Sequence, residues 1–272
     1  MKRKFLGWLL GCGLVLTGYA QPNQLFIIGV KHKGSKALNH RDLKALLEQV
    51  GPDVVLLEED SNTYTDGKLH KIFGEKTAAF LGIWKIDVER RATRLYIDKK
   101  PGLYVGAFDM VIPARNQYVN YQTQMEAGFD QALRQLFADG LLKGTDSLYY
   151  NHYRTLNTKV LDAIDSSLAV LNRETLMDTV RQVMSLENTQ IREWSNRYAQ
   201  LENYRIWFNG SCDFWELRNQ RMCANIADIL VNRKGQKIVV LTGMMHKYFL
   251  TDFFKNNKWA NQVTVVGWPF LP

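Results

Sequence analysis

A compact pattern near the start of the chain limits the fold most strongly. Residues 25–30 are an apolar run that predicts a buried strand, residues 39–50 carry apolar side chains at helical spacing, and residues 53–57 are a second apolar run. Gly51 and Pro52 stand where the helix must end. A strand, a helix and a strand joined this closely form a βαβ unit with parallel strands and a right-handed crossover. The sequence therefore predicts an α/β fold.

Further strands follow, separated by a long helical block. Apolar runs at residues 103–108, 237–242 and 263–268 predict three more strands, whereas residues 113–204 have a helical period and no convincing strand. Helices that accompany parallel strands cover the faces of the sheet. We therefore expect a parallel or mostly parallel central sheet flanked by helices, with a large all-helical insertion or cap at about residues 110–205.

The first twenty residues predict a secretory signal peptide. Basic residues 2–4 precede an apolar stretch at 5–16, and small residues at 18–20 form a cleavage site. Residues 21–272 then make a single exported domain, periplasmic or secreted. Residues 9–12 loosely resemble a lipoprotein box but divide the apolar stretch, so a lipid anchor is the less favoured alternative. No later stretch of sequence reaches transmembrane length.

The charge pattern argues against nucleic acid as a partner. The net charge of +8 falls to +5 once Lys2, Arg3 and Lys4 leave with the leader. The densest basic segment, residues 85–100, interleaves its cations with Asp and Glu, which predicts a solvated face, and no known nucleic-acid-binding motif accompanies it. We therefore expect a small molecule or a peptide as the substrate.

Two short runs in the chain are alike. Residues 27–32 and residues 241–246 are both apolar stretches that lead into Gly-x-x-His, so that each ends in a histidine, His32 and His246. Ligands of open α/β sheets bind beyond the carboxyl ends of the strands, where glycine allows close approach of the backbone. Because glycine ends many strands, either motif alone carries little information. The pair predicts that two imidazoles meet at one edge of the sheet, with Gly29 and Gly243 beside a bound cofactor.

Acidic residues end the second strand at the same predicted edge. Residues 54–57 are apolar and lead directly into Glu58, Glu59 and Asp60. Because strand side chains alternate in direction, Glu58 and Asp60 share one face and Glu59 takes the other. The acids can equally solvate the exit of the strand or cap the next helix. We take Glu58 as the candidate site residue.

A later helix supplies a candidate cation. The turn signal Asn209-Gly210 and the capping residue Asp213 predict a helix over residues 214–231. Arg218 falls within its apolar stripe, and an inward-facing guanidinium must meet a counter-charge or an anionic ligand. The alternative is an arginine that extends outward from the first turn, with only its stem against the apolar surface.

Together these segments resemble the ordered motifs of the TraB/Tiki superfamily, which is related to erythromycin esterases and ChaN-like haem-binding proteins. The motifs that carry the resemblance are Gly29 to His32, Asp53 to Glu58, Arg218 to Cys223 and Gly243 to His246. The resemblance implies a hydrolytic α/β fold in which His32, Glu58, Arg218 and His246 converge. It also implies varied chemistry, since Tiki-like members are metal-dependent peptidases, erythromycin esterases open an ester without a required metal, and ChaN-like members carry haem.

These residues lead us to expect an exported hydrolase of ester or peptide-type bonds. In a metal form, His32, Glu58 and His246 hold one divalent ion, Zn or Mn, which lowers the pKa of a bound water. In a metal-free form, one histidine is the general base, Glu58 orients it, and in both forms Arg218 stabilises the oxyanion. A haem- or iron-binding protein is the main alternative. A scaffold without activity is the third.

Overall fold

A computed structural model describes residues 21–70, 87–256, 259 and 262–268. Within these ranges the chain forms one five-stranded sheet in which every pairing is parallel, in the order β3-β2-β4-β1-β5. This confirms the predicted α/β fold. The strands are β1 Asn23–Val30, β2 Val54–Asp60, β3 Tyr104–Asp109, β4 Lys237–Gly243 and β5 Val263–Val265.

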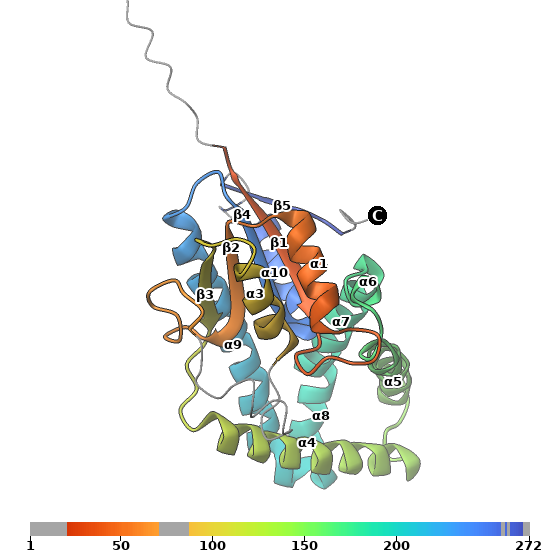
Figure 1. Cartoon of the computed structure of the whole chain (residues 1–272). Helices are drawn as coiled ribbons and strands as arrows, with labels where there is room; N and C mark the ends of the chain where they lie inside the picture. Colours follow the sequence, from red (N-terminus) through yellow and green to blue (C-terminus); the bar gives the residue numbers. More distant parts are fainter. Residues whose placement is uncertain (1–20, 71–86, 257–258, 260–261, 269–272) are drawn as a thin grey trace, which may run out of the picture.

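Helices cover both faces of the sheet. In Figure 1, α1 (His40–Val50) and α3 (Val88–Ile97) lie in front of the strands, and α9 (Arg205–Val231) and α10 (Met244–Asn256) lie behind them. Alternate strand residues serve the two faces: in β2, Val55 packs with the α1 and α3 side and Leu56 with the α9 side. The central strands are therefore apolar on both faces, as expected for a parallel sheet buried between helices.

A helical layer lies beyond the carboxyl ends of the strands, below the sheet in Figure 1. It has its own core, which includes Phe129, Tyr150 and Trp194. The layer corresponds to the predicted helical insertion. The α-helices of the insertion are α4 Arg115–Ala138, α5 Thr145–Ala163, α6 Leu168–Leu171, α7 Glu174–Leu186 and α8 Arg192–Arg197, with a π-helix at Glu187–Ile191 and a 3-10 helix at Ala199–Tyr204. Of these, α6 and α7 lie beside the sheet in Figure 1 and pack into its core.

Two helices begin elsewhere than the sequence predicts. Helix α9 begins at Arg205, so Asn209 and Gly210 are helical and make no turn. The Asn209 side chain donates to the carbonyl of Arg205 and accepts a hydrogen bond from Arg192, so tertiary contacts outweigh its turn propensity. Asp213 pairs with Arg192 at 2.8 Å instead of capping a helix. Helix α10 begins directly after β4, which places His246 in a helix instead of at a strand end.

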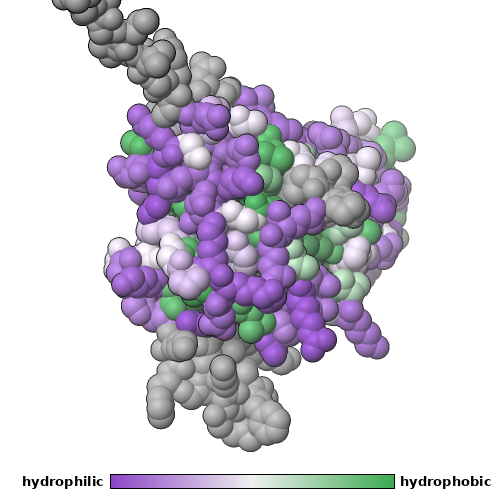
Figure 2. Space-filling view, turned by 45° about the horizontal axis from the view of Figure 1, so that its top comes forward, coloured by the Kyte–Doolittle hydropathy of each residue, from purple (hydrophilic) through white to green (hydrophobic). Residues whose placement is uncertain are grey.

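The surface is mainly polar. On the face shown in Figure 2, hydrophilic residues predominate and hydrophobic ones lie in small separate groups. In the part of the chain that the structure describes, no helix is both long and apolar enough to cross a bilayer. The longest of these helices, α9, has 27 residues but carries charged side chains along most of its length. The predicted leader, residues 1–20, lies outside the described residues.

Candidate functional site

The sheet brings the predicted site residues to one edge. Strand β4 lies between β1 and β2, so the strands that carry the two Gly-x-x-His motifs and Glu58 are neighbours. Val30 at the end of β1 is in register with Gly243, and Leu57 of β2 with Leu241. The chain segments that carry His32, Glu58 and His246 therefore leave neighbouring strands at the same level, and their side chains meet.

Glu58 is the centre of this cluster. Its side chain is only 4% exposed. One carboxylate oxygen accepts hydrogen bonds from the Gly243 amide and the Thr242 hydroxyl, both at 2.7 Å, and the other accepts one from Arg218, also at 2.7 Å. Burial raises the pKa of Glu58, but the positive charges of His32 and Arg218 outweigh it and hold the pKa well below its usual range. Glu58 is therefore ionised although it is buried.

Arg218 faces inward from α9 and its side chain is 17% exposed. It donates two hydrogen bonds of 2.9 Å to Asp109 and one to Glu58, and its Nη1 lies 3.1 Å from Nε2 of His246. The alternative of an arginine that extends outward into solvent is therefore wrong. Asp109 was not among the predicted site residues, although its position at the end of the third strand was a signal that could have identified it.

His246 is neutral in this arrangement. Its ring stacks on Trp215 with the centroids 4.3 Å apart, and its Nδ1 lies 2.8 Å from Oδ1 of Asn219. Arginine has only donors, so Nε2 of His246 must accept the Arg218 hydrogen and Nδ1 must donate to Asn219. Burial and the positive charge of Arg218 lower the pKa of His246 to about 4.

His32 lies in the loop after β1 and differs from His246 in exposure and charge. Its side chain is 37% exposed, with Nε2 3.7 Å from Oε1 of Glu58. Its Nδ1 is hydrogen-bonded to Glu89 of α3, which is buried. Burial lowers the pKa of His32, but hydrogen bonds and charge from Glu58 and Glu89 more than offset it and raise the pKa well above its usual value. His32 is therefore the protonated, accessible member of the pair.

Glu89 lies in the segment that the sequence analysis assigned to a solvated face. That expectation is wrong for this residue, because α3 turns Glu89 inward against His32. Neighbouring Arg90 pairs with Glu59 at 3.1 Å, on the other face of β2 from Glu58. The sequence places Glu89 and Arg90 in the same segment of mixed charge. It does not show which turn of α3 packs against the edge of the sheet, so it could not predict that Glu89 is buried.

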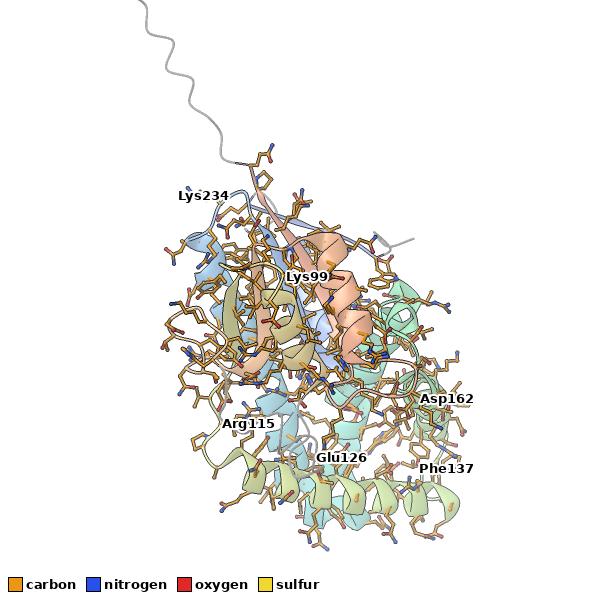
Figure 3. All side chains as sticks on the ribbon, viewed as in Figure 1. Lys99, Arg115, Glu126, Phe137, Asp162 and Lys234 are labelled. Carbon is orange, nitrogen blue, oxygen red and sulfur yellow. The ribbon has the colours of Figure 1, made fainter. Side chains whose placement is uncertain are left out.

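A cleft of about 830 Å³ opens over the cluster. His32, Glu58, Arg218 and His246 all line it. Apolar side chains form much of the remaining wall: Val30, Val119, Ile164, Trp215, Met244 and Met245. Arg115, where the chain enters α4 in Figure 3, also lines the cleft and pairs with Asp60 and Asp109. The cleft therefore has the charged cluster at its base and apolar side chains along much of its wall.

The two motif glycines have different surroundings. A Cβ on Gly243 would lie 3.1 Å from Nε2 of His32 and 3.5 Å from Glu58, so only glycine lets these groups approach the backbone. A Cβ on Gly29 would instead lie 3.2 Å from the backbone of Met244. Gly29 also exchanges two hydrogen bonds with the side chain of Asn172. Gly29 therefore permits close packing, whereas Gly243 belongs to the cluster.

The predicted metal ligands do not fit a metal ion as they are arranged. The lone pair on Nε2 of His246 accepts from Arg218, and Oε2 of Glu58 already accepts two hydrogen bonds from protein donors. A metal ligand must offer a free lone pair, so an ion would have to displace the guanidinium. Among the described residues, no group of three or more His, Cys, Asp or Glu is arranged to hold a metal.

Comparisons with models of protein families, with curated proteins and with solved structures found no match to this chain. The resemblance to the TraB/Tiki superfamily therefore stays a prediction that rests on the motifs quoted above. The site is defined by its geometry: an accessible cationic histidine, a buried neutral histidine, and a carboxylate fixed by an arginine.

Proposed function

We propose that this protein is a hydrolase of ester or peptide-type bonds that acts through His32 and Arg218 without a metal. The observation that carries the proposal is that His32 lines the cleft, with its Nε2 close to Glu58 and to the backbone of Gly243. An imidazole that is accessible on one side and anchored on the other is suited to proton transfer. The carbonyl group of the substrate occupies the cleft between His32 and Arg218.

His32 acts as the general base in its neutral form and then as the acid that protonates the leaving group. It takes a proton from the attacking water, and Glu58 stabilises the imidazolium that results. Because nearby carboxylates raise the pKa of His32 well above 6.5, most molecules hold it protonated at neutral pH. The rate should therefore rise with pH through a pKa above 6.5, and a rate that falls over this range would contradict the role of general base.

Arg218 stabilises the oxyanion of the tetrahedral intermediate. A guanidinium has five N–H donors, and the contacts to Asp109, Glu58 and His246 use four of them. The fifth, on Nη1, has no partner among the described residues and is available to a substrate oxygen. Asp109 and Glu58 hold the guanidinium rigid, so it need not reorganise as the negative charge develops.

The apolar wall of the cleft favours a substrate with an apolar group next to the scissile bond. Trp215 stacks on His246, and Met245 and Val119 also line the cleft. Both a small ester and a peptide with an apolar side chain meet this requirement. The first twenty residues of the sequence predict that the protein is exported, so its substrates would be compounds found outside the cytoplasm.

The test is a screen of aryl esters of increasing acyl length and of fluorogenic peptides, in the presence and absence of a chelator. We expect turnover that resists the chelator and is lost in His32→Gln. His70→Gln is the matched control, because His70 is exposed and pairs only with Asp66 among the described residues. Chelator-sensitive activity together with stoichiometric bound metal would overturn the metal-free form. A Soret band on addition of haemin, without hydrolysis, would favour the haem alternative.

A further inference from the structure

The two Gly-x-x-His motifs are alike in sequence, but their histidines are held by different groups. In both rings Nδ1 has a partner on a neighbouring helix, which leaves Nε2 directed toward Glu58. The partner of His246 is the amide oxygen of Asn219 on α9, and the partner of His32 is the carboxylate of Glu89 on α3. These partners lie 27 and 57 residues away along the chain.

Glu89 is an unusual residue to find buried. It is 3% exposed, and its Oε2 has no hydrogen-bond partner in the part of the chain that the structure describes. Burying a carboxylate is costly unless it is paired. Its Oε1 contacts Nδ1 of His32, and the described residues provide no other ion pair for it. A group so placed for packing alone would be better replaced by an apolar side chain, so the contact with His32 accounts for its presence.

We infer that Glu89 is a positioning residue, which holds His32 in the one tautomer and orientation that present Nε2 to the cleft. An ionised carboxylate only accepts hydrogen bonds, so Nδ1 must carry the hydrogen and the lone pair of the neutral ring must lie on Nε2. Nε2 is the atom that faces Glu58 and lines the cleft. This inference rests on the proposed function, because Glu89 would orient the ring nitrogen of His32 that acts as the general base.

The chain distinguishes this role from simple packing of α3. Thr93 lies one helical turn after Glu89, is fully buried, and also has a side-chain oxygen without a partner among the described residues. Thr93 is not among the residues that line the cleft. Thr93→Val therefore disturbs the same buried face of the helix without altering the group that holds the imidazole.

The decisive experiment compares Glu89→Gln with Thr93→Val in both kinetics and NMR. Glutamine keeps the size of the side chain but can donate as well as accept, so it no longer enforces one tautomer. We expect E89Q to lower kcat by about 10- to 100-fold with KM nearly unchanged, as for other residues that orient an active-site histidine. T93V should keep the wild-type kcat.

The NMR readout does not depend on catalysis. In the wild type, long-range 15N–1H spectra recorded where His32 is neutral should show the hydrogen on Nδ1, whereas E89Q should show the Nε2–H tautomer or a mixture. A wild type that already carries the hydrogen on Nε2, or an E89Q spectrum that equals that of the wild type, would overturn the inference. If no substrate is hydrolysed but the tautomer changes in E89Q, the proposed function fails and the positioning role of Glu89 stands.

Discussion

Glu58 at the sheet edge and the partly buried Glu187 in the helical layer are both shielded from solvent, yet their pKa values move in opposite directions. Burial raises the pKa of Glu187 to about 7, and its main polar contact is the hydroxyl of Tyr153 at 2.9 Å. Burial also raises the pKa of Glu58, but the positive charges of His32 and Arg218 hold it well below normal. Burial thus favours the neutral acid, and only nearby cations reverse that preference.

The comparison shows which region is built for charge. At the sheet edge, acidic and basic side chains from strands and helices distant in sequence form ion pairs next to the cleft. In the helical layer, partial desolvation and the nearby Asp130 also raise the pKa of Glu126, an exposed residue of α4 that is labelled in Figure 3. Among the described residues, neither Glu126 nor Glu187 has a salt bridge to a cation. The edge is therefore the region where ionic chemistry at neutral pH is expected.

The largest effect should come from removing the cation of the sheet edge. Arg218→Met leaves Glu58 and Asp109 buried without their main partner, which typically costs about 3–5 kcal/mol of unfolding free energy. Urea denaturation measures the change. The control is Arg134→Met in the helical layer, whose ion pair with Asp130 is largely exposed and should contribute less than about 1 kcal/mol. Equal losses of unfolding free energy in the two variants would contradict the difference between the sheet edge and the helical layer.

The next largest effects are expected for substitutions of the two histidines, which should differ from each other. His246→Ala removes a buried ring that stacks on Trp215, so we expect a loss of about 3 kcal/mol. His32→Ala opens no core cavity but leaves the buried Glu89 without its partner, which should cost about 1–3 kcal/mol, and it should abolish turnover. Thermal unfolding and an activity assay on the same samples check both statements. A His32→Ala protein that fails to fold would mean that the residue is structural.

The geometry of the guanidinium should matter apart from its charge. Arg218→Lys keeps the cation but loses the planar fork that bridges Asp109, Glu58 and His246. We expect turnover to fall by roughly 10²-fold with little change in KM, because a transition-state donor is lost. Full activity in this variant would remove Arg218 from the mechanism and leave only the cluster of histidines and carboxylate.

The smallest effect concerns Glu187 and depends on pH. Its carboxyl ionises near 4.5 in the unfolded chain but only near pH 7 in the folded protein, so the unfolded state binds fewer protons between these values. Stability should fall as the pH rises from about 4.5 to 7. The full shift corresponds to roughly 3 kcal/mol, and because Glu187 is only partly buried, Glu187→Gln should stabilise the protein by about 2 kcal/mol at pH 8, with little effect at pH 4. The midpoints of urea unfolding at pH 4 and pH 8 test this prediction. A variant that is less stable than the wild type at pH 8 would show that other groups stabilise the ionised carboxylate of Glu187.

Local patterns in the sequence determined the elements and their meeting point. The apolar runs that end at Val30, Leu57 and Thr242 could only be buried strands, and a βαβ unit fixes which ends of the strands lie together. From this the sequence predicted that His32, Glu58 and His246 would share one edge. It also placed Arg218 on the inner face of a helix, because helical spacing is a local property.

Tertiary structure alone decided the chemical state of those residues. The two histidine motifs predict equivalent roles, yet Glu58 and Glu89 make one imidazole cationic while burial and Arg218 keep the other neutral. Asp109, which anchors Arg218, comes from a further strand, 109 residues away from it along the chain. A pKa depends on burial and on charges within a few ångströms, and these are set by segments far apart in the sequence. The sequence by itself therefore determined where the site lies, and the packing of distant segments decided which of its groups carry charge.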